Sequence, residues 1–266
     1  MRHTVLFPGL GIGPLSIKNN FKFFGLTIHW YGILIALGLV LAYLFASKKA
    51  KKRGISQDTL LDVVLWGLPS AVVCARIYYV VFSWDSYKDN LLDVFKIWGG
   101  GIAIYGAIIG ACISTLIYCH IKKISFKSVF DVGSFGLLIG QIVGRWGNFI
   151  NAEAYGSRTE TALFRMKLVE KGITVHPTFL YESFFNLLLF IFLNIYEKHQ
   201  KFDGELFLVY ITLYGLGRFF IEGMRADSLM WGPVRVSQIL ALLCVLIGLA
   251  LIITGRIKHK NNIVNN

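Results

Sequence analysis

Long apolar runs separated by short polar or glycine-rich stretches dominate this sequence. The runs lie at 30–47, 60–83, 98–120, 128–148, 178–196, 204–222 and 233–254. Each comes close to the roughly 20 apolar residues that a helix needs to span the hydrocarbon core of a bilayer. The pattern therefore predicts an all-α integral membrane protein with about seven transmembrane helices. The second run contains Pro69, and the third begins with three glycines at 99–101, so kinks or re-entrant segments are possible in these two runs.

Composition agrees with a membrane protein built as one unit. Of the 266 residues, 55% are hydrophobic and 16% are charged, whereas soluble domains carry about 25% charged residues. We see no internal repeat and expect a single polytopic domain over 1–266. Its predicted parts are an outer arm at 1–29 touching the interface through Phe21, Phe23 and Phe24, a helical core at 30–254, outer loops near 84–97, 151–177 and 223–232, and a polar cytoplasmic tail at 255–266.

Basic residues predict how the chain is oriented. Lysine and arginine crowd the segments after the first, third, fifth and seventh runs, at 48–53, 122–127, 198–201 and 256–260. Under the positive-inside rule these segments are cytoplasmic, which places the N-terminus outside and the C-terminus inside. The same loops account for the net charge of +12. We therefore expect no nucleic-acid partner, because no soluble basic domain is visible to bind one.

Small residues predict how the helices pack. Gly136, Gly140 and Gly144 recur every four residues, and Gly106 and Gly110 form a second pair. Small residues at this spacing let helix backbones approach closely in lipid. At the start of the fourth run, Ser128-x-x-Asp131 resembles a capping box.

The four cysteines predict no chemistry. All of them fall inside predicted helices, none shows metal-ligand spacing, and none lies on an outer loop where a disulfide would form. We read them as small apolar residues of packed helices and expect no metal and no cofactor.

A polar stretch at the end of the fourth run is the most informative feature. Arg145, Asn148, Asn151 and Glu153 follow directly on strongly apolar sequence. A charge at membrane depth costs roughly 2.5–3.5 kcal/mol on insertion scales, so it indicates a functional site. Arg145 and Asn148 point to one side of a helix because they are three residues apart. A planar cation beside amide groups suits a phosphate or a carboxylate.

A second polar group lies on the sixth run. Tyr214, Arg218 and Glu222 are spaced i, i+4, i+8 and form one stripe, and Arg225 follows Glu222 by three residues. One interpretation is an Arg–Glu pair that only locks two helices together. The other is that Arg218 faces a polar cavity, with Glu222 orienting it or handling protons. Arg76 in the second run is open to a structural or a functional interpretation alike.

Further polar residues gather at or near the predicted outer side. His29 and Tyr31 open the first run, Tyr105 lies in the third, and His176 precedes the fifth. Each alone is typical of an interfacial anchor, but together they indicate that several helices contribute to one outward-facing polar cavity that binds an anion.

These motifs resemble the phosphatidylglycerol–prolipoprotein diacylglyceryl transferase family of bacteria. The resemblance covers nearly the whole chain and is most specific over Gly144-Arg-x-Gly-Asn-Phe-Ile-Asn-x-Glu-x-x-Gly156. The supporting motifs are His29-Trp-Tyr-Gly32, Trp98-Gly-Gly-Gly-Ile-Ala-Ile-Tyr-Gly106, His176-Pro-Thr-Phe-Leu-Tyr-Glu182, and Gly217-Arg-Phe-Phe-Ile-Glu222 with Arg225.

The resemblance implies a lipid transferase of the bacterial cytoplasmic membrane. Such an enzyme moves the sn-1,2-diacylglyceryl group of phosphatidylglycerol to the lipobox cysteine of a preprolipoprotein, forming a thioether and releasing glycerol phosphate. The implied partners are phosphatidylglycerol, preprolipoprotein signal peptides that carry a lipobox, and membrane lipid. The residues expected to bind phosphatidylglycerol are Arg145, Asn148, Asn151, Glu153, Gly156, Tyr214 and Arg225. Those expected to act in catalysis are Arg218, Glu222, Tyr105, His29 and Tyr31.

The proton acceptor is the open part of this assignment. An attacking thiol with a pKa near 8.5 needs a base or a positive field to become a thiolate. Some relatives carry a histidine where this chain has Tyr105, and a neutral tyrosine with a pKa of about 10 is a poor base. Our hypothesis is that Tyr105 positions substrate, which leaves His29, Tyr31 or Glu222 to handle the proton.

Two other classes remain as alternatives on residue patterns alone. A secondary transporter of an organic anion also places arginines near the membrane middle, but it more often shows paired broken helices and an internal repeat. A scaffolding membrane protein has little reason to keep an Arg–Asn–Asn–Glu run beside an Arg–Glu stripe. The resemblance favours the enzyme over both.

Overall fold

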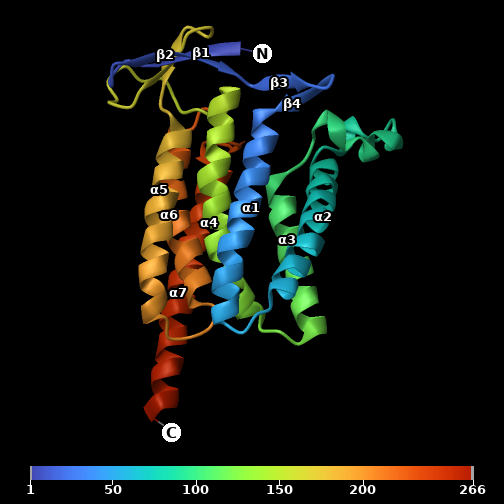
Figure 1. The fold of residues 1–266 in the computed structure, drawn as a ribbon, viewed down its shortest axis with the longest axis vertical. Coiled ribbons are helices and arrows are strands. Elements are labelled where there is room, and N and C mark those ends of the chain that lie inside the picture. The colour runs from blue at the N-terminus through green and yellow to red at the C-terminus, as the bar shows by residue number, and fades with distance from the viewer. Residues whose placement is uncertain (1, 265–266) are drawn as a thin grey trace. The chain divides into compact units, whose positions relative to one another are not determined.

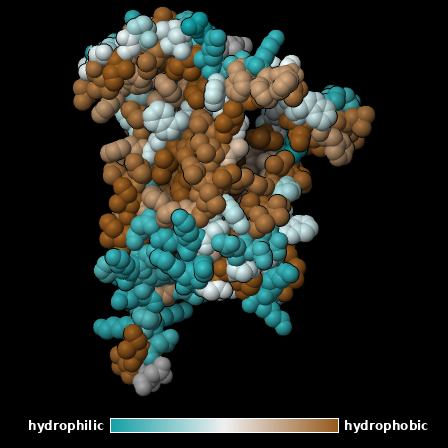
Figure 2. Space-filling view, viewed as in Figure 1, coloured by the Kyte–Doolittle hydropathy of each residue, from teal (hydrophilic) through white to brown (hydrophobic). Residues whose placement is uncertain are grey.

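In a computed structural model that describes residues 2–264, the chain is mostly helical (Figure 1). Seven of its helices are long and apolar enough to cross a membrane, which makes it a multi-pass membrane protein. They are α1 (Trp30–Lys52), α2 (Gln57–Phe82), α3 (Ile104–Lys122), α4 (Phe126–Asn151), α5 (Thr178–Tyr196), α6 (Glu205–Met224) and α7 (Val236–Val264). Hydrophobic side chains cover much of the face shown in Figure 2, and many large apolar residues of the helices are exposed.

The contacts divide the chain into two compact units. The larger unit contains the described residues up to Ala46 and those from Phe130 onward. It therefore holds most of α1 and α4, all of α5 to α7, and the strands. The smaller unit, Ser47–Val129, holds α2, α3 and their connection. That connection has three short 3₁₀ turns, at Trp84–Ser86, Leu91–Phe95 and Ile97–Gly99.

The N-terminal arm is a β structure. Strands β1 (Arg2–Phe7) and β2 (Ile12–Lys18) join β5 (Met166–Leu168) and β6 (Ile173–Val175) in an antiparallel sheet of order β2-β1-β5-β6. Two hairpins are added, β3 (Asn20–Phe23) with β4 (Leu26–His29), and β7 (Met230–Trp231) with β8 (Val234–Arg235). The all-helical prediction therefore describes the membrane segments and not the arm.

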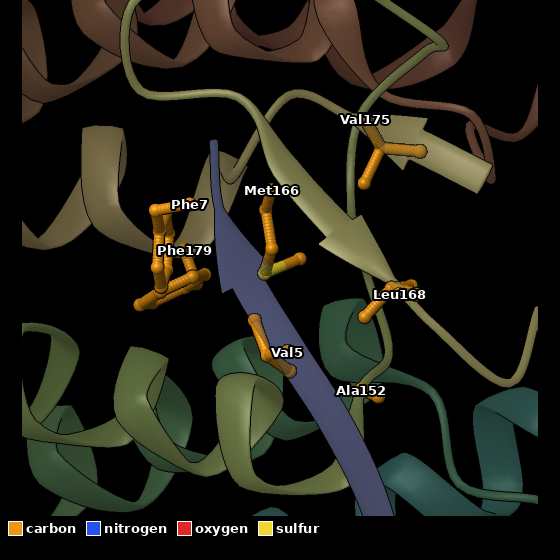
Figure 3. Close-up of a cluster of buried hydrophobic side chains, with 7 residues drawn as sticks. All are labelled: Val5, Phe7, Ala152, Met166, Leu168, Val175 and Phe179. Carbon is orange, nitrogen blue, oxygen red and sulfur yellow. The ribbon is translucent and has the colours of Figure 1, made fainter. Parts of the chain in front are cut away.

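The sheet packs on the ends of two helices through buried apolar side chains. Val5, Met166 and Leu168 of the sheet lie in one buried cluster with Phe179 of α5 (Figure 3). Phe149 of α4 packs against the same cluster, and its ring is stacked 4.7 Å from that of Phe179. This cluster fixes the first turn of α5 beside the last turn of α4, which is where the polar motifs lie. We call this the sheet end of the larger unit.

Two predicted helix boundaries were wrong. The third helix begins at Ile104 and not at residue 98, because Gly100 and Gly101 have positive φ angles of 89° and 75° and cannot continue a helix. The seventh helix continues to Val264 and does not end at residue 254. Its polar tail stays helical beyond Arg256, which reaches Glu205 of α6 at 2.6 Å and the Tyr196 hydroxyl of α5 at 2.7 Å.

The prediction of close helix packing is confirmed for Gly106 and Gly110, whereas Gly136 and Gly144 make only ordinary contacts and a Cβ on Gly140 would meet nothing within 4 Å among the described residues. A Cβ on Gly136 would touch Ala42 of α1 at 3.7 Å, and one on Gly144 would touch Ile35 of α1 at 3.6 Å. The approach of α3 to α2 is closer, since a Cβ on Gly106 would lie 2.4 Å from the Cys74 carbonyl oxygen. Pro69 lies inside a continuous α2.

Ser128 of the predicted capping box lies inside α4, which begins at Phe126, and Asp131 reaches a second helix. The Ser125 hydroxyl accepts the Ser128 amide at the start of α4, whereas Asp131 is fully buried and accepts the backbone amides of Gly204 at 2.8 Å and Phe207 at 2.9 Å. It therefore caps α6, a partner too distant in sequence for a local pattern to reveal.

Candidate active site

Glu182 is the centre of a buried ion-pair cluster at the sheet end. Its carboxylate receives Arg145 of α4 at 2.6 Å on one oxygen and Arg218 of α6 at 2.9 Å on the other. The Tyr214 hydroxyl donates to it at 3.2 Å. The side chain of Glu182 is 2% exposed, and those of Arg145 and Arg218 are 23% and 17% exposed. One carboxylate thus joins three helices and holds two guanidinium groups near each other.

The α6 stripe forms as predicted. Arg218 also pairs with Glu222 one turn further along the helix, and Glu222 is buried as well. The backbone carbonyl of Glu222 accepts Arg235, which precedes α7. Arg218 thus makes two ion pairs of different kinds. Its pair with Glu182 joins two helices, whereas its pair with Glu222 lies within α6.

The end of α4 carries the rest of the polar run. Arg145 donates to the Asn148 side-chain oxygen at 3.3 Å. The amides of Asn148 and Asn151 both donate to one oxygen of Glu153, at 3.1 and 3.3 Å. A hydrogen-bonded chain therefore leads from the exposed Glu153 through Asn148 to Arg145. This arrangement limits the positions that the Arg145 guanidinium can take.

The turn that returns Glu153 to the helix end is strained. Ala152 and Ala154 on either side of Glu153 have φ angles of +50° and +52°, a region that costs free energy for any residue with a Cβ. Two side chains hold this turn. The Thr178 hydroxyl donates to the Ala154 carbonyl at 2.7 Å, and Lys171 donates to the Ala152 carbonyl at 3.2 Å.

Gly156 and Arg225 meet where the loop after α4 crosses the end of α6. They form an isolated antiparallel bridge, and a Cβ on Gly156 would lie 2.7 Å from the Cβ of His176. Gly156 is thus required for packing, and its contact with substrate stays a prediction. The Arg225 guanidinium makes two bonds to Asp227, at 3.0 and 2.9 Å, and is 3.9 Å from Glu222.

The remaining predicted residues have different placements. Tyr31 of α1 lies against α4, since a Cβ on Gly147 would be 2.5 Å from its ring. His29 ends β4 opposite Asn20 and is exposed. Tyr105 belongs to the smaller unit, with its ring 6.4 Å from that of Tyr78. The larger unit therefore brings together every predicted site residue except these last two.

Arg76, for which the sequence allowed a structural or a functional role, holds the connection between α2 and α3 in the smaller unit. It is buried and donates to the backbone carbonyls of Asp93, Val94, Gly100 and Gly101 at 2.7 to 2.9 Å. Four such bonds fix the connection that leads into α3.

Comparison with known proteins decides the family. The model of the prolipoprotein diacylglyceryl transferase family matches residues 18–254. The chain belongs to the prolipoprotein diacylglyceryl transferase family. Relatives named phosphatidylglycerol–prolipoprotein diacylglyceryl transferase include one from Listeria welshimeri, 47% identical over 94% of this chain and 93% of that protein. Others are from Clostridioides difficile, 45% identical over 91% and 97%, and from Finegoldia magna, 44% identical over 92% and 97%.

Membership of the diacylglyceryl transferase family favours the enzyme over a transporter or a scaffold. Within residues 2–264, no group of three or more His, Cys, Asp or Glu side chains is placed to hold a metal ion.

Glu182 is the residue that sequence reasoning did not assign a role. Glu182 enters the family resemblance only as the last residue of the motif at 176–182. It is nevertheless an acidic residue inside a strongly apolar run. The cost of burying a charge in the membrane, which singled out Arg145, applies equally to Glu182. That signal was available, but its two arginine partners lie 37 residues before and 36 residues after it and only folding brings them together.

Proposed function

We propose that this protein transfers the sn-1,2-diacylglyceryl group of phosphatidylglycerol to the lipobox cysteine of preprolipoproteins. The observation that carries the proposal is the convergence of Arg145 and Arg218 on Glu182 at the sheet end. These residues belong to three of the motifs that match the family. The proposed product is a thioether, and glycerol phosphate leaves.

The two arginines are the proposed phosphate ligands. As the carbon–oxygen bond to the phosphate breaks, negative charge develops on the leaving oxygen, and planar guanidinium groups stabilise it through charge-assisted hydrogen bonds. In this structure the positive charges of Arg145 and Arg218 are paired with the carboxylates of Glu182 and Glu222. We infer that the phosphate shares the guanidinium N–H groups with these carboxylates, while Asn148, Asn151 and Glu153 keep Arg145 in place or bind the headgroup glycerol.

The cysteine sulfur is the proposed nucleophile. It attacks the sn-3 carbon of the glycerol backbone, so that a carbon–sulfur bond forms as the carbon–oxygen bond breaks. The thiol proton passes to a base or to the departing phosphate. His29, Tyr31 and Glu222 are the proposed proton carriers, with Tyr105 positioning substrate. Among the candidates of the larger unit, Glu222 has direct contact with an arginine of the cluster.

The proposed location is the bacterial cytoplasmic membrane, with the sheet end outside and the end of α7 in the cytoplasm. The basic segments after α1, α3 and α5 support this orientation through the positive-inside rule. The substrate fits it, because phosphatidylglycerol is a membrane lipid and the lipobox follows the membrane-spanning part of a signal peptide.

The test incubates purified protein in phosphatidylglycerol bilayers with a lipobox peptide and measures the peptide mass. The wild type is expected to add a diacylglyceryl group to the cysteine, and Arg145→Ala is expected to lose this activity. Arg256→Ala is the matched control, since it removes a helix arginine whose partners are Glu205 and Tyr196. Absence of the adduct from folded wild type would overturn the proposed reaction, and equal activity of Arg145→Ala would overturn the role of the cluster.

A further inference from the structure

A buried polar layer lies in the larger unit beneath the ion-pair cluster. Asn186 of α5 is fully buried, and neither its amide nitrogen nor its carbonyl oxygen has a hydrogen-bond partner among the residues that the structure describes. The side-chain oxygen of Gln141 on α4 is also buried without a hydrogen-bond partner among the described residues, although the side-chain nitrogen donates to the Tyr210 hydroxyl at 2.8 Å. We call Gln141, Asn186 and Tyr210 the buried amide layer.

The layer is one helical turn deeper in the membrane than the cluster. Asn186 follows Glu182 by four residues on α5, so both side chains point to the same side of that helix. Helix α6 runs antiparallel to α5, and Tyr210 precedes Tyr214, the hydroxyl partner of Glu182, by four residues. The rings of Tyr210 and Tyr214 are stacked 5.7 Å apart. On both helices the layer is therefore about 6 Å from the cluster along the helix axis, because four residues rise by about 1.5 Å each.

Unpaired amides at this depth need an explanation. Leaving a buried donor or acceptor unsatisfied costs free energy, and native proteins contain few such groups. The neighbouring positions on the same helix are apolar and packed, as shown by the fully or nearly fully buried Leu189 and Leu193. A leucine of similar size at position 186 would avoid the cost. The amide therefore points to a hydrogen-bonding ligand that is present for part of the reaction.

We infer that Asn186 is a binding residue for an ester carbonyl of the donor lipid, and this inference rests on the proposed function. In a diacyl phospholipid the ester carbonyls follow the phosphate by a few bonds, on the acyl-chain side. When the phosphate is bound by Arg145 and Arg218, these carbonyls reach the depth of the buried amide layer. Esters offer only acceptors, so the group that they match is the Asn186 amide N–H.

The closed layer opens when the lipid enters. Asn186 is 0% exposed, and a lipid whose headgroup is held by the cluster keeps its acyl chains in the membrane, so the helices beside Asn186 separate to admit it. The unpaired amide lowers the cost of this opening because the closed state does not satisfy it. In the open state the amide N–H donates to the ester, which favours a diacyl over a dialkyl glycerol group.

The experiment compares two donor lipids in each variant. One is diacyl phosphatidylglycerol, and the other is its dialkyl ether analogue, which lacks both carbonyl oxygens and can react at the same carbon. The quantity measured is the ratio of kcat/KM for the ester lipid to that for the ether lipid. This ratio cancels changes in folding or in the amount of active protein, because both lipids are tested on the same preparation.

The wild type is expected to prefer the ester lipid by about tenfold, which corresponds to about 1.4 kcal/mol. Asn186→Leu and Asn186→Ala are expected to lose this preference by losing activity on the ester lipid. Asn194→Leu is the matched control, because Asn194 lies two turns further along α5 and donates to the Phe190 carbonyl at 2.8 Å. It is expected to keep the ratio.

Three results would overturn the inference. The first is a wild-type ratio near one. The second is a ratio unchanged in both Asn186 variants, which is the behaviour of a residue that only supports the helix or binds water. The third is the same loss of preference in Asn194→Leu. Failure of the proposed function looks different, since neither lipid would then be transferred by folded wild type.

Discussion

Replacement of Glu182 by glutamine removes the negative charge that both site arginines share. The side chain keeps its size and one acceptor, but two ion pairs of 2.6 and 2.9 Å are lost. Glu222 would then be the only carboxylate paired with Arg145 or Arg218 in the described structure, so the repulsion between the two guanidinium groups would be poorly compensated. We expect the guanidinium groups to separate, which weakens their hold on a common phosphate.

The size of the effect follows from the burial of the groups. Removing one partner of a buried ion pair costs about 3–5 kcal/mol, but the arginine side chains are 23% and 17% exposed and water screens part of this loss. We therefore take the lower end, about 3 kcal/mol. Because about 1.4 kcal/mol is a factor of ten, kcat/KM for diacylglyceryl transfer should fall on the order of 100-fold if the loss appears in the transition state.

The assay measures transfer per folded molecule in phosphatidylglycerol bilayers, together with thermal unfolding. Glu205→Gln is the matched control. Glu205 is also fully buried on α6 and is bonded to Arg256 at 2.6 Å, to Tyr196 at 2.8 Å and to the Lys201 amide at 2.5 Å, but at the opposite end of the helix. We expect Glu205→Gln to lose stability and keep its activity per folded molecule. If both variants retained the same activity, Glu182 would only hold helices together and the reasoning would be wrong.

Three further predictions follow from other parts of the structure. Tyr105→Phe should retain turnover with weaker substrate binding, as measured by separate kcat and KM values; lost turnover with intact phosphatidylglycerol binding would show that Tyr105 is the base. Thr178→Val removes the bond to the Ala154 carbonyl and should lower kcat/KM about tenfold, corresponding to about 1.4 kcal/mol, while Thr178→Ser restores it. The Thr4 amide donates to Glu170 and lowers the pKa of that carboxyl below its usual 4.5. Because the folded pKa is depressed, this stabilisation is present above the unfolded pKa and is lost as the pH falls through the folded value. In Glu170→Gln the free energy of unfolding should therefore fall less steeply as the pH is lowered into the acid range. An acid-range slope equal to that of the wild type would contradict this prediction.

Much of the membrane fold could be predicted from the sequence. Apolar runs of about 20 residues must be helices in lipid, because every backbone amide and carbonyl needs a partner within the segment. The two helix ends that were mispredicted have causes that hydropathy does not show. Gly100 and Gly101 delay α3 through their positive φ angles, and Arg256 keeps α7 helical through a partner on α6.

The N-terminal sheet was harder to foresee. Strand β1 pairs with β5, so Val5 lies opposite Leu168, and no periodicity within residues 1–29 reveals a partner so far along the chain. The residues predicted to touch the interface, Phe21, Phe23 and Phe24, belong instead to the separate β3–β4 hairpin, where Phe23 and Phe24 are exposed, whereas Val5 of the sheet is fully buried. Pairing of β1 with the distant strand β5 decides the burial of Val5.

By itself the sequence determined the number of membrane helices and predicted which residue types carry the chemistry, because both depend on local composition and on the cost of charge in lipid. On that ground it predicts Arg145, Arg218 and Glu222 as site residues. Only the tertiary structure decided that Glu182 joins the two arginines, and that Asn186, one turn below it, has no hydrogen-bond partner among residues 2–264. Contacts between α4, α5 and α6 are made across helices, and the spacing of residues along one helix carries no information about the side chains of another.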